Sequence, residues 1–463
     1  MAGLTFSRRA LIADACALAA LPAGRALART TAVRQPDILF IMADDLGYAD
    51  VSCYGRTSYR TPVIDGLAAG GLRFLQGYAN SAVCSATRTA LVTGRYQQRF
   101  LIGLEEPVGP AKRLSLPEGT PTIASRFKDL GYRTALVGKW HVGAPPDHGP
   151  TRYGYDHFFG MSSGAADYFG HAGAPADPGR RRGGLFFDET SVDREGYLTD
   201  LLADEAGRWI GEGGDAPFLL SLHFNAPHWP WEGPEDRAHS QSLRILRDPS
   251  GGSLETFARM VVAMDTAIGR VLRGLERSRR GRETIIVFTS DNGGERYSDM
   301  WPFTGMKGEL LEGGLRVPLI VNWPGRVKPG GVSDQVMTSM DFLPTLLAAA
   351  GGPALSAQDT DGVNLLPQIL GEAPPVSRTL FWRFKANEQA AVRDGDWKYL
   401  KLGGKEHLFH VASDPRERAE LAEVHPERLA ALKARYAAWD NEMLPYGADT
   451  SSEDVKRSFP DRY

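Results

Sequence analysis

Short apolar segments alternate with amphipathic segments along most of the chain. The apolar segments predict strands, and they are "PDILFIMA", "RTALVG", "APFLLSLHF", "ETIIVFTS" and "RVPLIVNW". The segments between them have the spacing of amphipathic helices, as in "GYLTDLLADEAGRWIGE" and "SLETFARMVVAMDTAIGRVLRGLERSRR". Continuous apolar strands separated by helices are typical of a parallel sheet that is covered on both faces. The pattern therefore predicts an α/β fold over residues 36–375, with a large, mostly parallel sheet sandwiched by helices.

Local signals place the ends of two further helices. Thr61 precedes Pro62 at the start of "TPVIDGLAAGG", so we expect Thr61 to be the N-cap and Pro62 the first helical residue. The segment "TPTIASRFKDLGY" predicts a helix that Gly131 ends.

The pattern changes near residue 376. The segment "RTLFWRFKANEQAAVRDGDWKYLKLGGKEHLFHV" predicts short strands joined by tight polar turns, and "PERLAALKARYAAWDNEM" predicts a late helix. A chain of 463 residues is also longer than one hydrophobic core usually serves. We therefore expect residues 376–463 to form a small α+β subdomain with an antiparallel sheet.

Composition excludes two classes of partner. The formal net charge is -3, and the Lys and Arg residues are scattered, so nothing points to a nucleic acid. Beyond the N-terminus, no apolar run reaches the roughly 18 residues of a membrane span.

The N-terminus has the three parts of an export signal. Arg8 and Arg9 are followed by an apolar run and then by the small-x-small sequence of residues 26–28. We expect residues 1–28 to be a twin-arginine-like signal peptide, with an amphipathic or disordered tail as the alternative. Cleavage would remove Cys16 and release a periplasmic or secreted protein.

Polar residues follow four of the predicted strands. They are Asp44 and Asp45, Lys139 and His141, Asn225 and His228, and Asp291 and Asn292. One such pair alone is usually turn chemistry. Because the carboxyl ends of parallel strands meet at one edge, where ligands bind in open α/β sheets, we expect all four pairs to form one site.

Two opposite sets of side chains result. The oxygen set suits Ca²⁺ rather than a softer metal, and it consists of Asp44, Asp45, Asp291 and Asn292. The cationic set consists of Arg88, Lys139, His141 and His228. Cations and a metal around one point predict an anionic substrate that has several oxygens.

Cys84 opens a predicted helix in "NSAVCSATRTALVTGRY". Hydroxyl residues and Arg88 surround it in sequence, which suits a modified nucleophile that meets an anion at a helix N-terminus. The alternative is a structural disulfide with Cys53, since both cysteines would be exported.

The motifs resemble those of the formylglycine-dependent sulfatases, which have the alkaline phosphatase fold. "CSATRTALVTGR" is similar to the sulfatase signature, and "GKWHVG" is similar to the second motif of that family. The resemblance extends from "PDILFIMADDLGYADVSCYG" to "HLFHVASDPRERAELA". The chain most resembles arylsulfatases and N-acetylgalactosamine-6-sulfatases.

The resemblance implies a role for each candidate residue. Cys84 would be oxidised to Cα-formylglycine, whose hydrate attacks sulfur, and Arg88 would hold that hydrate. One Ca²⁺ would be held by Asp44, Asp45, Asp291, Asn292 and the oxygen at position 84. Lys139 and Lys307 would grip the sulfate. His228 would protonate the leaving alcohol, and His141 would act as the base for the second step.

The resemblance also implies a partner, because another enzyme must generate the formylglycine. Ala86 stands where many aerobic members have proline, so the sequence leaves open which maturation system acts here. Two rival functions share these motifs: a phosphonate or phosphate ester hydrolase, and a sulfated-glycan-binding protein whose Cys84 stays a thiol.

Substrate residues are expected in loops outside the motifs. Trp229 and Trp231 stand beside His228 and could stack on a sugar ring or simply pack a loop. Arg180, Arg181 and Arg182 could form a rim for a second anion or a solvated loop. A small sulfated carbohydrate is the expected substrate.

Overall fold

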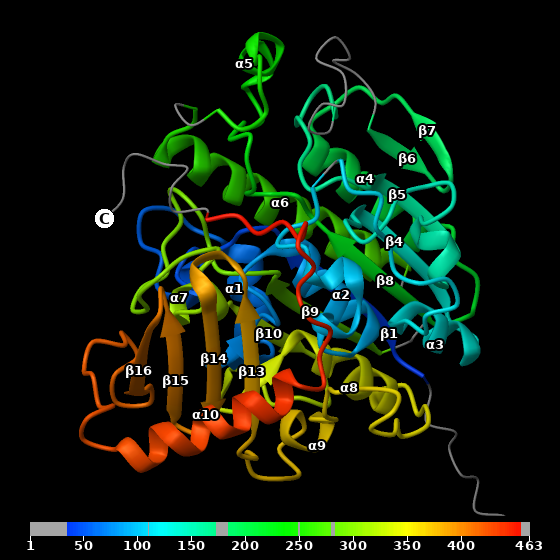
Figure 1. Ribbon diagram of the computed structural model, residues 1–463. Helices are drawn as coiled ribbons and strands as arrows, with labels where there is room; N and C mark the ends of the chain where they lie inside the picture. The colour runs from blue at the N-terminus through cyan, green and yellow to red at the C-terminus, as the bar shows by residue number, and fades with distance from the viewer. Residues whose placement is uncertain (1–34, 110, 173–183, 249–250, 279–282, 455–463) are drawn as a thin grey trace, which may run out of the picture. The chain divides into compact units, whose positions relative to one another are not determined.

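A ten-stranded sheet is the largest element of the computed structural model (Figure 1). The described residues are 35–109, 111–172, 184–248, 251–278 and 283–454. The strands of this sheet are β1 Asp37–Ala43, β2 Leu72–Phe74, β4 Arg133–Lys139, β5 His157–Met161, β6 Leu185–Phe187, β7 Thr190–Val192, β8 Phe218–His223, β9 Thr284–Ser290, β10 Leu319–Asn322 and β11 Gly331–Ser333. Their order is β11-β2-β10-β9-β1-β8-β4-β5-β6-β7. A separate two-stranded sheet pairs β3 Gly77–Tyr78 with β12 Met337–Thr338.

The middle of the large sheet is parallel and buried on both faces. Strands β9, β1, β8, β4 and β5 run parallel, whereas β10 and β6 join antiparallel at the two sides. Along β1, Leu39 and Ile41 pack into one core, and Ile38 and Phe40 pack into the other. Burial of both faces explains why these strands are continuous apolar runs in the sequence. The predicted fold class is confirmed.

Helices cover both faces of this sheet. The α-helices are α1 Pro62–Ala69, α2 Cys84–Thr93, α3 Ile123–Asp129, α4 Leu198–Gly211, α5 Arg237–Ser242, α6 Leu254–Ser278, α7 Glu312–Leu315, α8 Phe342–Ala349, α9 Leu366–Ile369 and α10 Pro426–Asp440. The 3₁₀ helices are Ser52–Tyr54, Gln97–Arg99, Leu101–Leu104, Pro150–Tyr153, Ser339–Asp341 and Ala386–Glu388. Helices α1, α4 and α6 share a core with Leu39, whereas α2, α3 and α8 pack on the opposite face.

The C-terminal elements form a four-stranded antiparallel sheet and one helix. The strands are β13 Thr379–Phe384, β14 Gln389–Asp394, β15 Trp397–Leu402 and β16 Lys405–His410. One face of this sheet packs on α10 through Leu432, and the other packs on Tyr78 and Val83 next to α2. Residues from 35 onward form one compact unit, so a domain boundary near residue 375 stays a prediction.

The predicted start of α1 is confirmed, with Thr61 as the N-cap residue and Pro62 as the first helical residue, but the capping hydrogen bonds come from elsewhere. Thr61 occupies the N-cap position, but its side chain makes no capping hydrogen bond, because its Oγ1 accepts from the Ser52 N–H at 2.9 Å instead. Asp265 of α6 caps the helix by accepting from Val63 N at 3.2 Å and Ile64 N at 2.9 Å. A helix from a distant part of the sequence thus supplies the cap. Gly131 ends α3 as predicted, with φ of 82°.

Two predictions fall outside the described residues. They are the signal peptide at residues 1–28 and the arginine rim at Arg180, Arg181 and Arg182. Across the part of the chain that the structure covers, none of the helices has the length and apolar character needed to span a membrane.

Asp265→Ala should lower the free energy of unfolding by about 1–3 kcal/mol, because two N–H groups of α1, one of them buried, lose their acceptor. Asp265→Asn keeps an acceptor oxygen and should lose less than half as much. Denaturant unfolding of the two variants measures the difference. Equal losses in both would show that the carboxylate does not cap α1.

Candidate active site

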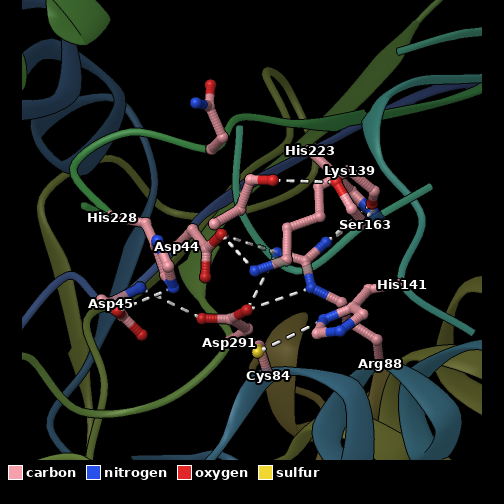
Figure 2. A network of polar contacts seen from close by, with 12 residues as sticks. Asp44, Asp45, Cys84, Arg88, Lys139, His141, Ser163, His223, His228 and Asp291 are labelled. Carbon is pink, nitrogen blue, oxygen red and sulfur yellow. Dashed lines mark hydrogen bonds and ion pairs between the residues drawn. The ribbon is translucent and has the colours of Figure 1, made fainter. Parts of the chain in front are cut away.

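Members of all four predicted pairs lie together at one edge of the sheet: Figure 2 shows Asp44, Asp45, Lys139, His141, His228 and Asp291. Asn292 Nδ2 donates to Asp45 Oδ1 at 2.7 Å, whereas Asn225 is buried but its Oδ1 has no partner among the described residues. Strand β1 leads to Asp44 and Asp45, β4 to Lys139 and His141, and β9 to Asp291. His228 follows β8, and Asn292 follows Asp291; all of these side chains are buried. Parallel strands explain the convergence, since their carboxyl ends share one edge.

Each of the three carboxylates at this edge pairs with a buried cation. Lys139 Nζ lies 2.5 Å from Asp44 Oδ2, and Lys307 Nζ lies 2.6 Å from Asp45 Oδ2. Arg88 donates from Nη2 to Asp291 Oδ2 at 2.8 Å and from Nε to the same oxygen at 3.1 Å. Buried charges are tolerated only when they are paired and hydrogen-bonded in this way.

The pKa values of the two adjacent aspartates move in opposite directions. Burial and the neighbouring Asp291 raise the pKa of Asp44 well above its ordinary value. Burial also favours the neutral form of Asp45, but Lys307 and Lys139 outweigh it and hold the pKa of Asp45 below its usual value. An additional positive charge at this edge would favour the ionised form of Asp44.

The oxygen set fits a hard divalent cation. Ligand atoms of Asp44, Cys84 and Asp291 lie within 4.8 Å of one another, and so do those of Asp44, Asp45 and His228. Asp44 Oδ1 and Asn292 Oδ1 are buried and have no hydrogen-bond partner among the described residues. Unpaired buried oxygens next to carboxylates are available as ligands for a metal such as Ca²⁺.

Two residues of the site have a left-handed backbone. Asp45 has φ of 62° and His141 has φ of 59°, although neither is a glycine. Such a conformation is uncommon outside glycine and costs of order 1 kcal/mol or more. Each residue directs a side chain into the cluster, so the unfavourable backbone serves the position of the side chain.

Cys84 is the first residue of α2 and is 1% exposed. Its Sγ lies 3.4 Å from His141 Nδ1. Cys84 and Cys53 are both free thiols, so the alternative of a disulfide between them is not what the structure shows. Burial raises the pKa of the Cys84 thiol to about 11.

The hydroxyl groups near Cys84 do not form the cluster around the sulfur that the sequence suggests. Thr87 Oγ1 exchanges hydrogen bonds with the backbone of Ser81, and Thr89 Oγ1 donates to Ser85 O at 2.9 Å. Ser85 Oγ accepts from Val108 N at 2.9 Å. These hydroxyls hold α2 and its neighbouring loop in place, because local backbone acceptors are within their reach.

The hydrogen bonds of the two histidines define their tautomers. His141 Nε2 lies 3.1 Å from Val108 O and His228 Nδ1 lies 2.6 Å from Trp229 O, so each of these nitrogens must donate. His141 Nδ1 therefore faces the sulfur as an acceptor. Burial together with nearby lysines lowers the pKa of both histidines well below the ordinary value, so both are neutral.

Lys307 reaches the cluster from a loop rather than from a strand end. The backbone N–H of Lys307 donates to Gly294 O at 2.9 Å, and the backbone N–H of Gly308 donates to Ala82 O at 2.9 Å. Burial opposes the charged ammonium, but Asp45 and Glu295 raise the pKa of Lys307 well above its ordinary value. Lys307 thus joins the site as the resemblance to sulfatases implies.

Two buried residues of the site were not predicted. His223, the last residue of β8, lies 3.5 Å from Arg88 Nη1 and 3.3 Å from Lys139 O through its Nδ1. Glu295 Oε2 lies 3.3 Å from Lys307 Nζ. The sequence signal for both is their place, since His223 ends a strand and Glu295 follows Asn292 in "DNGGE".

The cluster lies at the floor of a pocket of about 640 Å³. Cys84, His141, His228 and Lys307 line this pocket, together with Trp229 and residues 107–109 and 162–165. Trp231 does not line it: its ring is buried and packs edge-on against Tyr297. One of the two tryptophans is therefore placed to meet a ligand.

The family described as Sulfatase matches residues 36–352. The chain therefore belongs to the sulfatase family and is a sulfuric ester hydrolase. The family described as "N-sulphoglucosamine sulphohydrolase, C-terminal" matches residues 306–435.

Relatives of known activity are similar over most of their length. Arylsulfatase A of Homo sapiens is 33% identical over 482 residues, which covers 90% of this chain and 89% of the relative. N-acetylgalactosamine-6-sulfatase of Canis lupus familiaris is 30% identical over 459 residues, which covers 87% of this chain and 84% of the relative.

Solved structures share the fold. Ps i-CgsB in complex with k-i-k-neocarrahexaose is 28% identical, with a TM-score of 0.80 over 92% of this chain and 96% of the other. The phosphonate monoester hydrolase of Agrobacterium radiobacter has a TM-score of 0.61 over 88% of this chain and 96% of the other. At 22% identity, that likeness shows the fold alone.

Proposed function

We propose that the protein hydrolyses sulfate esters of carbohydrates, using formylglycine at position 84 and a bound Ca²⁺. The observation that carries the proposal is the position of Cys84, whose Sγ lies 3.4 Å from His141 Nδ1 on the pocket floor. With its pKa raised to about 11, an unmodified thiol there is protonated at neutral pH and is a poor nucleophile. Oxidation to an aldehyde replaces it with a group whose hydrate has two hydroxyls.

The two hydroxyls divide the reaction into two steps. In the first, one hydroxyl loses its proton as its oxygen attacks sulfur, the bond from sulfur to the ester oxygen breaks, and the leaving alcohol takes up one proton, so the number of protons is unchanged. In the second, the other hydroxyl gives its proton to His141 Nδ1, and its oxygen forms the carbonyl double bond. Sulfate then leaves with the electrons of its bond to the aldehyde carbon, which restores the aldehyde. A serine or a thiol has no second hydroxyl and would stay sulfated.

The buried cations bind and orient the reacting groups in this proposal. Lys139 and Lys307 hold the sulfate oxygens, and Arg88 holds the hydrate one helical turn from position 84. In the ligand-free protein these cations are bound to Asp44, Asp45 and Asp291. They are therefore already fixed in place, so binding an anion requires little reorganisation.

Asp44, Asp45, Asp291 and Asn292, with the oxygen at position 84, would hold the Ca²⁺. A divalent cation bound there would supply positive charge beside the sulfate oxygens. The unpaired Asp44 Oδ1 and Asn292 Oδ1 support this assignment, and an all-oxygen set favours Ca²⁺ over Zn²⁺.

His228 is the proposed acid for the leaving alcohol. Burial and, after it, the charges of Lys307 and Lys139 lower the pKa of His228, so His228 Nε2 carries no proton in the ligand-free protein. A sulfate between these lysines would offset their charge and raise the pKa of His228. Substrate binding would thereby prepare the acid at the step that needs it.

The relatives support a substrate class, and the N-terminus supports a location. One relative is named N-acetylgalactosamine-6-sulfatase, and the solved Ps i-CgsB is in complex with k-i-k-neocarrahexaose, which supports a sulfated sugar as the substrate. The twin-arginine-like start supports export to the periplasm or beyond. A formylglycine-generating enzyme is the implied partner, and folded export would allow it to act first in the cytoplasm.

A phosphonate or phosphate ester hydrolase is the rival within the same fold. It would use the same cations, and it is supported here by fold similarity alone. Relative turnover of an aryl sulfate and an aryl phosphonate by one preparation separates the two functions.

Cys84→Ser should abolish turnover of 4-nitrophenyl sulfate by roughly 10³-fold or more, because the second step has no hydroxyl to use. Its melting temperature should stay close to that of the wild type. Cys53→Ser is the matched control, since Cys53 is the other free cysteine of the described chain. Similar residual activity in the two variants would remove Cys84 from the nucleophile role.

Ca²⁺ should stabilise the chelated protein, by about 2.7 kcal/mol at a concentration of 100 times its Kd. Asp291→Asn keeps an acceptor for Arg88 but removes a charged ligand, so it should lose most of this gain and most activity. Thermal unfolding and turnover with added Ca²⁺ or Zn²⁺ measure both effects. Better recovery with Zn²⁺ would contradict the oxygen-ligand assignment.

The loss of kcat caused by His228→Ala should depend on which alcohol leaves. Sugar sulfates should lose about 100-fold or more in kcat, because a sugar alkoxide needs a proton, whereas 4-nitrophenyl sulfate should lose much less. His239→Ala, an exposed histidine of α5, is the control and should change neither. An equal loss on both substrates would exclude His228 as the acid.

A further inference from the structure

The chain returns to the active site after α10. Residues 444–454, here named the C-terminal strap, run back from α10 along residues 98–106, which lie just before the pocket-lining residues 107–109 (Figure 1). Leu444 N donates to Gln98 O at 3.0 Å, and Ser452 forms an isolated parallel bridge with Glu106. The strap therefore lies against the residues that follow α2.

Glu106 anchors the strap. It is 2% exposed and accepts from Tyr446 Oη at 2.6 Å, Ser452 Oγ at 2.7 Å and Lys385 N at 2.7 Å. Two residues further on, Val108 O accepts the hydrogen bond of His141. The strap is thus attached to the same short segment that orients a candidate catalytic histidine.

At its end the strap places a carboxylate in the pocket wall. Glu453 lines the pocket with Cys84 and Lys307, and its N–H donates to Glu106 O at 2.9 Å. Glu453 Oε2 accepts from Arg247 Nη1 at 2.9 Å, and Arg247 also lines the pocket. Their side chains are 51% and 27% exposed, so a ligand can reach both.

This pair lies on the leaving-group side of the pocket. The Arg247 guanidinium lies 5.7 Å from the centre of the Trp229 ring, which is 4.5 Å from the ring of His228. His228 is the proposed acid for the leaving alcohol. Whatever is esterified to the sulfate must therefore extend toward Trp229, Arg247 and Glu453.

We propose that Glu453 and Arg247 form a hydroxyl-binding pair that recognises the sugar part of the substrate. A carboxylate accepts and a guanidinium donates, and a sugar hydroxyl can do both, so adjacent hydroxyls on one ring match the pair. Glu453 is then a specificity-determining residue supplied by the C-terminal strap. The inference rests on the proposed function, because it assumes that a sulfated sugar enters the pocket.

The test compares two substrates in one variant. Glu453→Ala should lower kcat/KM for a monosulfated hexose that has no other charged group by about 10- to 100-fold, the effect of one charge-assisted hydrogen bond. The loss on 4-nitrophenyl sulfate, which has no hydroxyl, should be at least tenfold smaller. Glu442→Ala is the matched control, since Glu442 is an exposed carboxylate just before the strap that pairs with Arg99 and does not line the pocket.

Three results would overturn the inference. Equal losses on both substrates would mean that Glu453 only supports the strap. A gain on a disulfated hexose with no loss on the monosulfated one would mean that Arg247 binds a second anion. A wild-type protein that hydrolyses neither substrate would fail the proposed function itself, and this inference with it.

Discussion

Asp44, Asp45 and Asp291 place three buried carboxylates side by side at the floor of the pocket, and the other charged side chains of the site are arranged around them. Each is neutralised by one cation, namely Lys139, Lys307 and Arg88. Removing one member of a buried pair leaves an uncompensated charge and costs about 3–5 kcal/mol. The need to pair every carboxylate explains why the cations come from three separate segments. Each cation reaches a different carboxylate, and none of the cations lies on the strands that lead to the carboxylates.

The same arrangement gives the pocket its chemistry. Cations that are fixed by carboxylates present positive charge to an anion without having to reorganise. Burial, together with Lys307 and Lys139, lowers the pKa of His228 and keeps it neutral, and His141 offers Nδ1 to position 84 because Val108 O holds its other nitrogen. The paired charges, the tautomer of His141 and the N-terminus of α2 thus meet at position 84, where the sulfur of the ester would be attacked. Trp229 and the C-terminal strap line the side of the pocket toward which the alcohol part of the ester would extend.

The sequence predicts the parts of this account that depend on local pattern. Parallel strands buried on both faces are continuous apolar runs, so the fold and the convergence of Asp44, Lys139, His228 and Asp291 at one edge follow from strand ends alone. Lys307 lies in a glycine-rich loop, and only the family resemblance assigns it to the site. Thr61 is a residue type typical of an N-cap and holds that position, but Asp265, distant in sequence, accepts the hydrogen bonds of the first N–H groups of α1. Glu453 shows no local signal, because its place depends on how the strap packs against Glu106.

The central claim is that position 84 acts as an aldehyde, and mass spectrometry of the peptide containing Cys84 tests it most directly. Preparations with different degrees of conversion are compared, each measured for the fraction of aldehyde, which is lighter than the thiol, and for turnover of 4-nitrophenyl sulfate. The account predicts that specific activity rises in proportion to the aldehyde fraction and vanishes in a preparation that contains only thiol. Full activity in protein whose Cys84 is entirely a thiol would contradict it.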